Sequence, residues 1–257
     1  MVKFYDSSYS YDYAFPAVTL AYFLRYPNPY STHVLSTDVI DRRFDPATQQ
    51  LHTVRLHLKR SKLPPALLKL LPRGLLGASS SGDSQSYILE RSTVDVREGW
   101  MDTESRNLEF TGVLSVVERQ VFRRPVDIFR SHNVHKSAAA HGLLEPGQTT
   151  DVTTTVTLHS KLGESIRKRR EAKAIASAEQ QQQQQQQPEK QPGFFKAWST
   201  ASIQRSIEII GLRRAEKSQP NAKEGMKIVL QRMRQGGLVA VLEGMRQDRE
   251  RILMGGG

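Results

Sequence analysis

Hydrophobic and polar residues alternate in several stretches of the first 160 residues, as they do in half-buried strands. In residues 51–59, Val54, Leu56 and Leu58 are separated by polar side chains, which predicts one buried face. Comparable stretches predict further strands at 34–44, 86–96, 101–110, 113–123 and 150–159. Strands this closely spaced favour an antiparallel sheet over βαβ units.

The helical period of three to four residues is found mainly toward the C-terminus. Residues 16–25 predict one short helix, because Pro16 suits a first helical turn. Apolar residues at helical spacing predict longer helices at 194–214, 222–234 and 238–254. Pro220 stands between the first two, and proline in a helix interior costs roughly 3 kcal/mol or kinks the helix. The sequence alone leaves open whether the helix continues past it.

Two segments follow neither period. Residues 63–82 hold seven leucines among Pro, Gly and Ser, and are too short and interrupted to span a bilayer. Residues 161–192 join a charge cluster to eight consecutive glutamines at 180–187. Low-complexity glutamine beside charges is typical of a solvated insertion, and long loops add little closure entropy. We therefore expect an insertion at about 164–192 that contributes nothing to the core.

The chain has 257 residues and a net charge of +11 that is concentrated in its second half. Residues 1–159 contain 18 Lys or Arg and 16 Asp or Glu, whereas residues 160–257 contain 19 and 10. A basic half is compatible with nucleic acid, with an anionic membrane surface, or with a surface that only keeps the protein soluble. The absence of cysteine excludes disulfides, thiolate catalysis and cysteine zinc sites.

No sequence motif supports catalysis. The chain lacks a Walker loop and the GxGxxG, HExxH and GxSxG patterns. His52 and His57 are five residues apart in an expected strand, so they face opposite sides and cannot share a metal ion. We therefore expect neither an enzyme nor a cofactor. A nucleic-acid-binding module also has little support, because the basic half holds only three aromatic residues for base stacking, namely Phe194, Phe195 and Trp198.

The segment RYPNPY at residues 25–30 combines a charged residue with two prolines at the end of an apolar helix. The prolines force an extended turn after Arg25. One interpretation is that Arg25 stabilises the negative end of the helix dipole. The other is that Arg25 points inward at an anion, because a buried anion is too costly without a cation beside it.

Four segments carry a resemblance to a known family. They are RYPNPYSTHVLSTDVI at 25–40, TVRLHLKRSKLP at 53–64, NLEFTGVLSVVERQVF at 107–122 and IGLRRAEKSQPNAKEGMKIVLQRM at 210–233. They resemble the PRELI-domain family, lipid carriers of the mitochondrial intermembrane space, and the first segment is most similar to the branch that carries phosphatidic acid. The resemblance implies an α+β fold like the START and phosphatidylinositol-transfer domains. In that fold a curved antiparallel sheet of about seven strands wraps a long C-terminal helix and encloses a lipid-sized cavity.

The resemblance also implies a function and its partners. The chain would carry phosphatidic acid from the outer to the inner mitochondrial membrane, where it supports cardiolipin synthesis. It would contact anionic membrane surfaces peripherally and bind a small helical partner with twin-cysteine motifs. Residues 1–234 would form the lipid-transfer domain, interrupted at about 164–192, and residues 235–257 a C-terminal extension. A phosphatidylserine carrier of the same family, a nucleic-acid-binding module and a scaffold that uses the poly-glutamine segment for docking remain alternatives.

Matching residues imply a phosphate site and a cover over it. Arg25 matches the arginine deep in the family's pocket, and the other basic residues that match positions in or near it are Arg55, Lys59, Lys62 and Arg214. The leucine-rich segment from residue 63 to 76 matches the lid loop, which would contact the membrane through Leu63, Leu67, Leu68, Leu70, Leu71, Leu75 and Leu76. If Arg25 only meets the lipid phosphate, the empty fold should tolerate its loss.

Overall fold

The computed structural model describes residues 2–62, 83–125, 147–160 and 200–254. They form seven strands and two helices in the order β1 (Val2–Tyr11), α1 (Phe15–Phe23), β2 (Val34–Asp45), β3 (Gln50–Lys62), β4 (Asp83–Asp95), β5 (Trp100–Asn107), β6 (Ser115–Arg123), β7 (Thr150–His159) and α4 (Thr200–Met254). The predicted insertion at 164–192 lies outside these residues.

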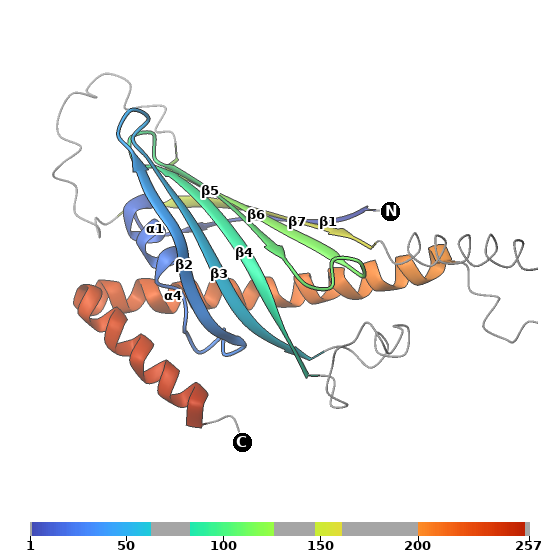
Figure 1. The fold of residues 1–257 in the computed structure, drawn as a ribbon. Helices are drawn as coiled ribbons and strands as arrows, with labels where there is room; N and C mark the ends of the chain where they lie inside the picture. Colours follow the sequence, from blue (N-terminus) through green and yellow to red (C-terminus); the bar gives the residue numbers. More distant parts are fainter. Residues whose placement is uncertain (1, 63–82, 126–146, 161–199, 255–257) are drawn as a thin grey trace, which may run out of the picture.

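All seven strands belong to one antiparallel sheet of order β1-β7-β6-β5-β4-β3-β2. The sheet curves over α4, and α1 lies between the two at one end (Figure 1). This arrangement confirms the expected α+β fold with a curved sheet around a long C-terminal helix. The six strands predicted from alternation are present. β1 was not predicted, because tyrosine and serine alternate in it rather than aliphatic residues.

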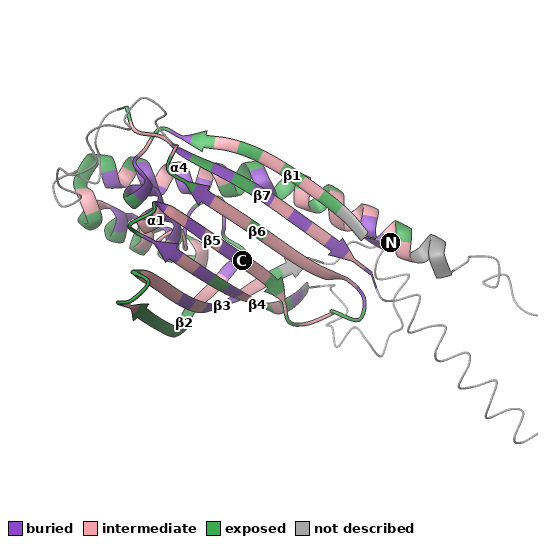
Figure 2. Ribbon diagram, turned by 90° about the horizontal axis from the view of Figure 1, so that it is seen from above, coloured by how far each residue is buried: buried purple, intermediate pink, exposed green. Residues whose placement is uncertain are grey.

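Burial along the strands follows their position in the sheet. In β7 every second residue is buried, which is the pattern of a strand with one face on a core. β2 forms one edge of the sheet, and its middle is exposed (Figure 2). Its exposed run includes Asp41, Arg42 and Arg43, and charged side chains on an edge strand oppose pairing with other chains.

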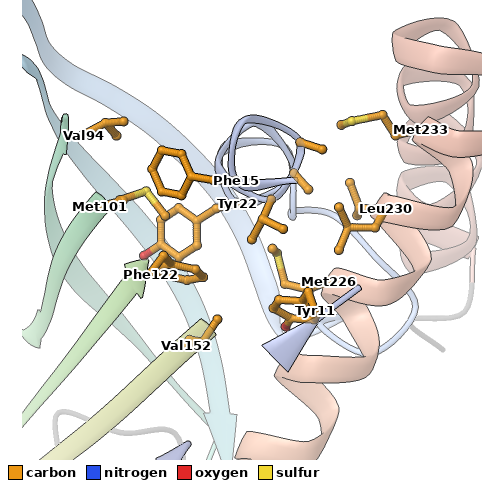
Figure 3. Packing of buried hydrophobic residues seen from close by; sticks show 14 of the residues in the cluster. Tyr11, Phe15, Tyr22, Val94, Met101, Phe122, Val152, Met226, Leu230 and Met233 are labelled. Carbon is orange, nitrogen blue, oxygen red and sulfur yellow. The ribbon is translucent and has the colours of Figure 1, made fainter. Parts of the chain in front are cut away.

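Helix α1 joins the sheet to α4 through side chains that are almost completely buried. Phe15 and Tyr22 reach the sheet, where they pack with residues such as Met101 and Phe122. On the other side of α1, Met226, Leu230 and Met233 of α4 complete the cluster (Figure 3). Because α1 is buried toward both layers, it fixes where α4 crosses this end of the sheet.

Helix α4 continues through Pro220, so the possible interruption there does not occur. Its backbone leaves the helical conformation instead at Gly236 and Gly237. Gly237 has φ of 63°, a left-handed conformation that favours glycine. The last helical turns then run in a different direction from the rest of α4 (Figure 1), and they are held by an ion pair of 2.6 Å between Arg232 Nη1 and the buried Asp248 Oδ2.

None of the helices among the described residues is long and apolar enough to cross a membrane. The seven leucines between residues 63 and 76, which are expected to form a lid, lie outside the described part of the chain.

Pro220 should lower the stability of the helix that contains it. Proline donates no backbone hydrogen bond and its ring crowds the preceding turn. We expect Pro220→Ala to stabilise the fold by about 1–3 kcal/mol and to raise Tm by several degrees in thermal melts. Ser218→Ala, an exposed change in the same turn, is the control for helix propensity. A Tm of Pro220→Ala that is equal to or lower than the Tm of the wild type would contradict this account.

Candidate functional site: a cavity with a cationic floor

A cavity of about 320 Å³ lies between the sheet and α4. Ligand pockets start at about 300 Å³. The cavity walls are largely apolar and come from β4, the β5–β6 loop, β6 and α4, with Ile88, Val113, Leu114, Val116, Ile207 and Ile210 among them. Its inner end reaches the core side chains Tyr22 and Phe122, which are each 2% exposed. At the other end it is lined by the exposed Arg106 and Arg214.

The inner end is organised around the carboxylate of Glu90, which is 1% exposed. Its Oε1 accepts hydrogen bonds from Nε and Nη2 of Arg55, at 2.8 and 2.5 Å. Its Oε2 accepts bonds from the hydroxyl of Tyr22 at 2.9 Å and from Nη2 of Arg25. A buried carboxylate without such partners would be too costly to keep ionised.

Arg25 lines the cavity and links it to α1. Its Nη1 donates to the carbonyl of Tyr22 at 2.7 Å, so Arg25 does satisfy the C-terminal end of α1. Its guanidinium also lies over the Tyr22 ring at 3.7 Å and the Tyr26 ring at 4.6 Å. Arg25 therefore does both things considered from the sequence: it binds the C-terminal end of α1, and it points inward at an anion, the carboxylate of Glu90. A guanidinium has five N–H groups, so donors remain for a ligand after the bonds to Tyr22 and Glu90.

Arg55 has a different position, although it resembles Arg25 in chemistry. It is 2% exposed, is not part of the cavity lining, and donates from Nη1 to the carbonyl of Phe23 at 3.0 Å. Its remaining bonds go to Glu90. Arg55 therefore neutralises Glu90 from behind the wall, rather than facing the cavity as the sequence comparison suggested.

His57 completes the cluster as a neutral side chain. Burial lowers its pKa, and the opposing pull of Glu90 does not reverse the shift. Nε2 lies 3.3 Å from Glu90 Oε2 and Nδ1 lies 2.9 Å from Thr37 Oγ1. In the neutral ring, Nε2–H then donates to Glu90 and Nδ1 accepts from Thr37.

The buried cluster of Arg25, Arg55 and Glu90 has one positive charge in excess, while Glu118, in the same cross-strand row as Glu90, and Lys59 also line the cavity. Burial alone would raise the pKa of Glu90, but Arg25, His57 and Arg55 hold it well below its ordinary value of 4.5. Glu90 is therefore ionised at neutral pH. It offsets one of the two arginines, and because Arg55 is bound to it from behind, the surplus charge faces the cavity on Arg25.

The turn after Arg25 is fixed against α4. The side chain of Asn28 donates to the carbonyl of Arg25 at 2.5 Å and accepts from the amide of Tyr30 at 2.8 Å. Asn28 lies so close to Gly225 that a Cβ there would be 2.7 Å from Asn28 Oδ1. A residue with a side chain at position 225 would displace Asn28 and, through it, the backbone of Arg25.

The other predicted basic residues fall into two groups. Lys59 and Arg214 line the cavity, and burial together with their charges lowers the pKa of the neighbouring His33 to about 4. Lys62 is the last residue of β3 and pairs with Asp83 of β4, and the position of its side chain lies outside the described part. The structure thus brings Arg25, Lys59 and Arg214 to one cavity. The leucines of the expected lid lie outside the described residues.

Glu90, Tyr22 and His57 were not identified from the sequence. A glutamate in a strand ordinarily faces solvent, and nothing in the local pattern marks Glu90 as buried. Its one signal is that Arg55 stands directly opposite it in the β3–β4 register, where opposite charges attract. That register is known only once the sheet is formed.

No group of three His, Asp or Glu side chains in the described ranges is placed to hold a metal ion. The fold and the site together define a protein that encloses an apolar cavity with a cationic inner end.

Comparisons with known proteins show which family the chain is similar to. Residues 16–142 match the model of the PRELI-like family. The chain is 37% identical over 123 residues to "Protein UPS1, mitochondrial" of Saccharomyces cerevisiae, covering 48% of this chain and 65% of that one. It is 33% identical over 122 residues to "PRELI domain-containing protein 1, mitochondrial" of Mus musculus, covering 48% and 52%. These matches relate residues 16–142, just under half of the chain, to the PRELI-like family.

These relatives are named as mitochondrial proteins, which agrees with the expected mitochondrial location. The match spans less than two thirds of their length. Among solved structures, the chain is similar to the Zhui aromatase/cyclase of a Streptomyces species, with a TM-score of 0.44 and 7% identity, covering 92% of this chain and 98% of that one.

The position of Glu90 makes its contribution to stability dependent on pH. In the folded protein its pKa is lowered, so its stabilising effect is complete above about 4.5 and is lost as the pH falls below that value. At pH 7, Glu90→Gln leaves two buried arginines without their anion and should destabilise the fold by about 3–5 kcal/mol. We expect this difference from the wild type to shrink as the pH falls below about 4.5, in urea unfolding followed by circular dichroism.

The control is Glu104→Gln, which breaks the surface pairs with Arg106 and Arg119. It should cost less than about 1 kcal/mol. A Glu90→Gln deficit that stays constant as the pH falls from 7 through 4.5 to about 2 would show that Glu90 is not ionised in the fold.

Proposed function

We propose that this protein is a phospholipid carrier that moves phosphatidic acid between the outer and inner mitochondrial membranes and so supports cardiolipin synthesis. The observation that carries the proposal is a buried cluster of two arginines and one glutamate, with a net positive charge, whose Arg25 lines the inner end of a largely apolar cavity. Acyl chains need apolar walls, and a phosphate taken out of water needs a cation that stays charged. An arginine also binds phosphate oxygens with two parallel hydrogen bonds.

The shape of the inner end supports phosphatidic acid over phosphatidylserine. The phosphate of phosphatidic acid ends the molecule, so it can approach Arg25 with nothing beyond it. In phosphatidylserine a serine follows the phosphate, and a serine placed beyond Arg25 would need the space that Tyr22, His57 and Glu90 occupy.

The alternatives receive less support. A nucleic-acid-binding module or a scaffold requires no cavity, whereas here apolar side chains from the sheet and α4 surround one. A carrier requires no covalent step, which suits a chain without a catalytic motif. We extend the proposal to the intermembrane space, to peripheral contact with anionic membranes, and to a small helical partner with twin-cysteine motifs. These three points rest on the family resemblance.

Arg25 is the residue whose replacement tests the proposal. We expect Arg25→Ala to weaken phosphatidic acid binding by about 3–5 kcal/mol, roughly a hundredfold or more in affinity. Arg25→Lys should recover only part of it, because an ammonium cannot form the paired bonds of a guanidinium. The measurement is transfer of fluorescent phosphatidic acid between vesicles. Arg43→Ala, which removes an exposed charge from edge strand β2, is the charge-matched control.

The structure changes the expected effect on the empty protein. Arg25 also binds Glu90 and the end of α1, so Arg25→Ala should lower Tm rather than be tolerated. Glu90 keeps Arg55 as a partner, so the loss should be smaller than for Glu90→Gln. Transfer by folded Arg25→Ala at the wild-type rate would refute the assignment of Arg25.

A further inference from the structure

The loop between β5 and β6, residues 108–114, is built by an unusual set of side-chain bonds. Asn107 Nδ2 donates to the carbonyls of Glu109 at 2.7 Å and Leu114 at 2.9 Å, and its Oδ1 accepts from the amide of Val116 at 2.8 Å. Glu109 Oε2 accepts from the amide of Tyr87 on β4 at 2.6 Å. These bonds hold both ends of the loop to the sheet, so the loop has a defined shape.

The same loop exposes one large apolar side chain, Leu108, beside the exposed Tyr87 of β4. Leu108 is 45% exposed, and its amide donates to the carbonyl of Tyr87, which is 42% exposed. Phe110 has φ of 58°, a left-handed conformation that costs energy for a residue with a side chain. A loop of defined shape that keeps Leu108 exposed next to Tyr87 offers an apolar contact to something outside the fold.

The other side of the loop forms the cavity. Phe110, Val113 and Leu114 line it, and Leu114 packs closely against Gly211 of α4, where a Cβ would lie 2.9 Å from Leu114 Cδ2. The loop lies at the same end of the sheet as the end of β3 and the start of β4, opposite the β4–β5 turn (Figure 1). It therefore borders the end of the cavity away from the buried cluster at Glu90.

The charges around this end are those that attract an anionic surface. Arg60 at the end of β3, Arg106 at the end of β5 and Arg213 on α4 are all exposed, and Arg106 also pairs with Glu104 at 3.1 Å. Each basic residue near an anionic membrane contributes about 1 kcal/mol of attraction. Aromatic residues such as Tyr87 are enriched where protein meets the membrane–water interface.

We infer that the β5–β6 loop is a membrane-docking wedge, in which Leu108 enters an anionic bilayer beside the open end of the cavity. This inference rests on the proposed carrier function, since it identifies the surface through which cargo would pass. Docking there places the apolar wall formed by Phe110, Val113 and Leu114 in line with the lipid acyl chains. A lipid could then enter or leave without its chains crossing water.

The absence of cysteine from the chain allows a direct test with a single label. Leu108→Cys, labelled with an environment-sensitive fluorophore, is mixed with vesicles of phosphatidylcholine and phosphatidylglycerol. The matched control is Val96→Cys, which is also exposed but lies in the β4–β5 turn at the opposite end of the sheet. We expect a blue shift at position 108 that lipid-attached quenchers suppress, and none at position 96.

A second variant measures the energetic effect. Leu108→Ser should weaken vesicle binding about fivefold, equivalent to about 1 kcal/mol of lost apolar burial, while Val96→Ser should not change it. Phosphatidic acid transfer, measured in parallel, separates the two proposals. If phosphatidic acid transfer continues while the label at position 108 stays in water, only the docking wedge is overturned. If the unlabelled wild-type protein transfers no phosphatidic acid, the carrier function is overturned.

Other occupants of the surface would give distinct results. A blue shift at position 108 without vesicles, growing with protein concentration, would show that a second copy of the chain covers the loop and would overturn the inference. Failure of the wild type to bind the anionic vesicles at low salt would overturn it as well.

Discussion

Glu90 lies in the protein interior, where an isolated carboxylate would be too costly to ionise without a cation beside it. Two arginines accompany it. Arg55 meets this requirement from behind the cavity wall, with two bonds to one oxygen. Arg25 shares the other oxygen and faces the cavity. A pair of charges would have made this end neutral. The third charge makes the cluster of Arg25, Arg55 and Glu90 positive, and Arg25 is held in place by the same bonds that stabilise the core.

The rest of the fold serves to hold Arg25 in that position. Tyr22 is packed between the sheet and α4, and it binds both Glu90 and, through its carbonyl, Arg25. Asn28 ties the following turn to the backbone of Arg25 and rests against Gly225 of α4. The small core around α1 thus positions both the helix that closes the cavity and the cation at its end. A change on α4 at Gly225 can for this reason shift Arg25 without touching it.

The sequence predicted the sheet well because alternation is a local property. It missed β1, where Tyr9 and Tyr11 provide the inward face and serines the outward one. It identified Arg25 through a resemblance and through the cost of burying an anion, both of which are independent of the fold's details. It could not identify Glu90, because its burial depends on the pairing of β3 with β4 and on the docking of α1. It placed Arg55 in the cavity for the same reason, since residue type alone does not tell which side of a wall a guanidinium occupies.

The carrier that we propose must release its cargo as well as bind it, and the carboxylate of Glu90 bears on this release. If Arg25 were the only charged group at the inner end, departure of a lipid phosphate would leave a buried cation without an anion, and release would be costly. With Glu90 beside it, Arg25 keeps an ion partner in the empty state and gains a second one in the loaded state. The free energy released when a lipid phosphate binds is then smaller than it would be for a guanidinium that had no partner in the empty protein. A moderate difference of this kind is what transport in both directions requires, since a cargo held too tightly would never leave at the second membrane.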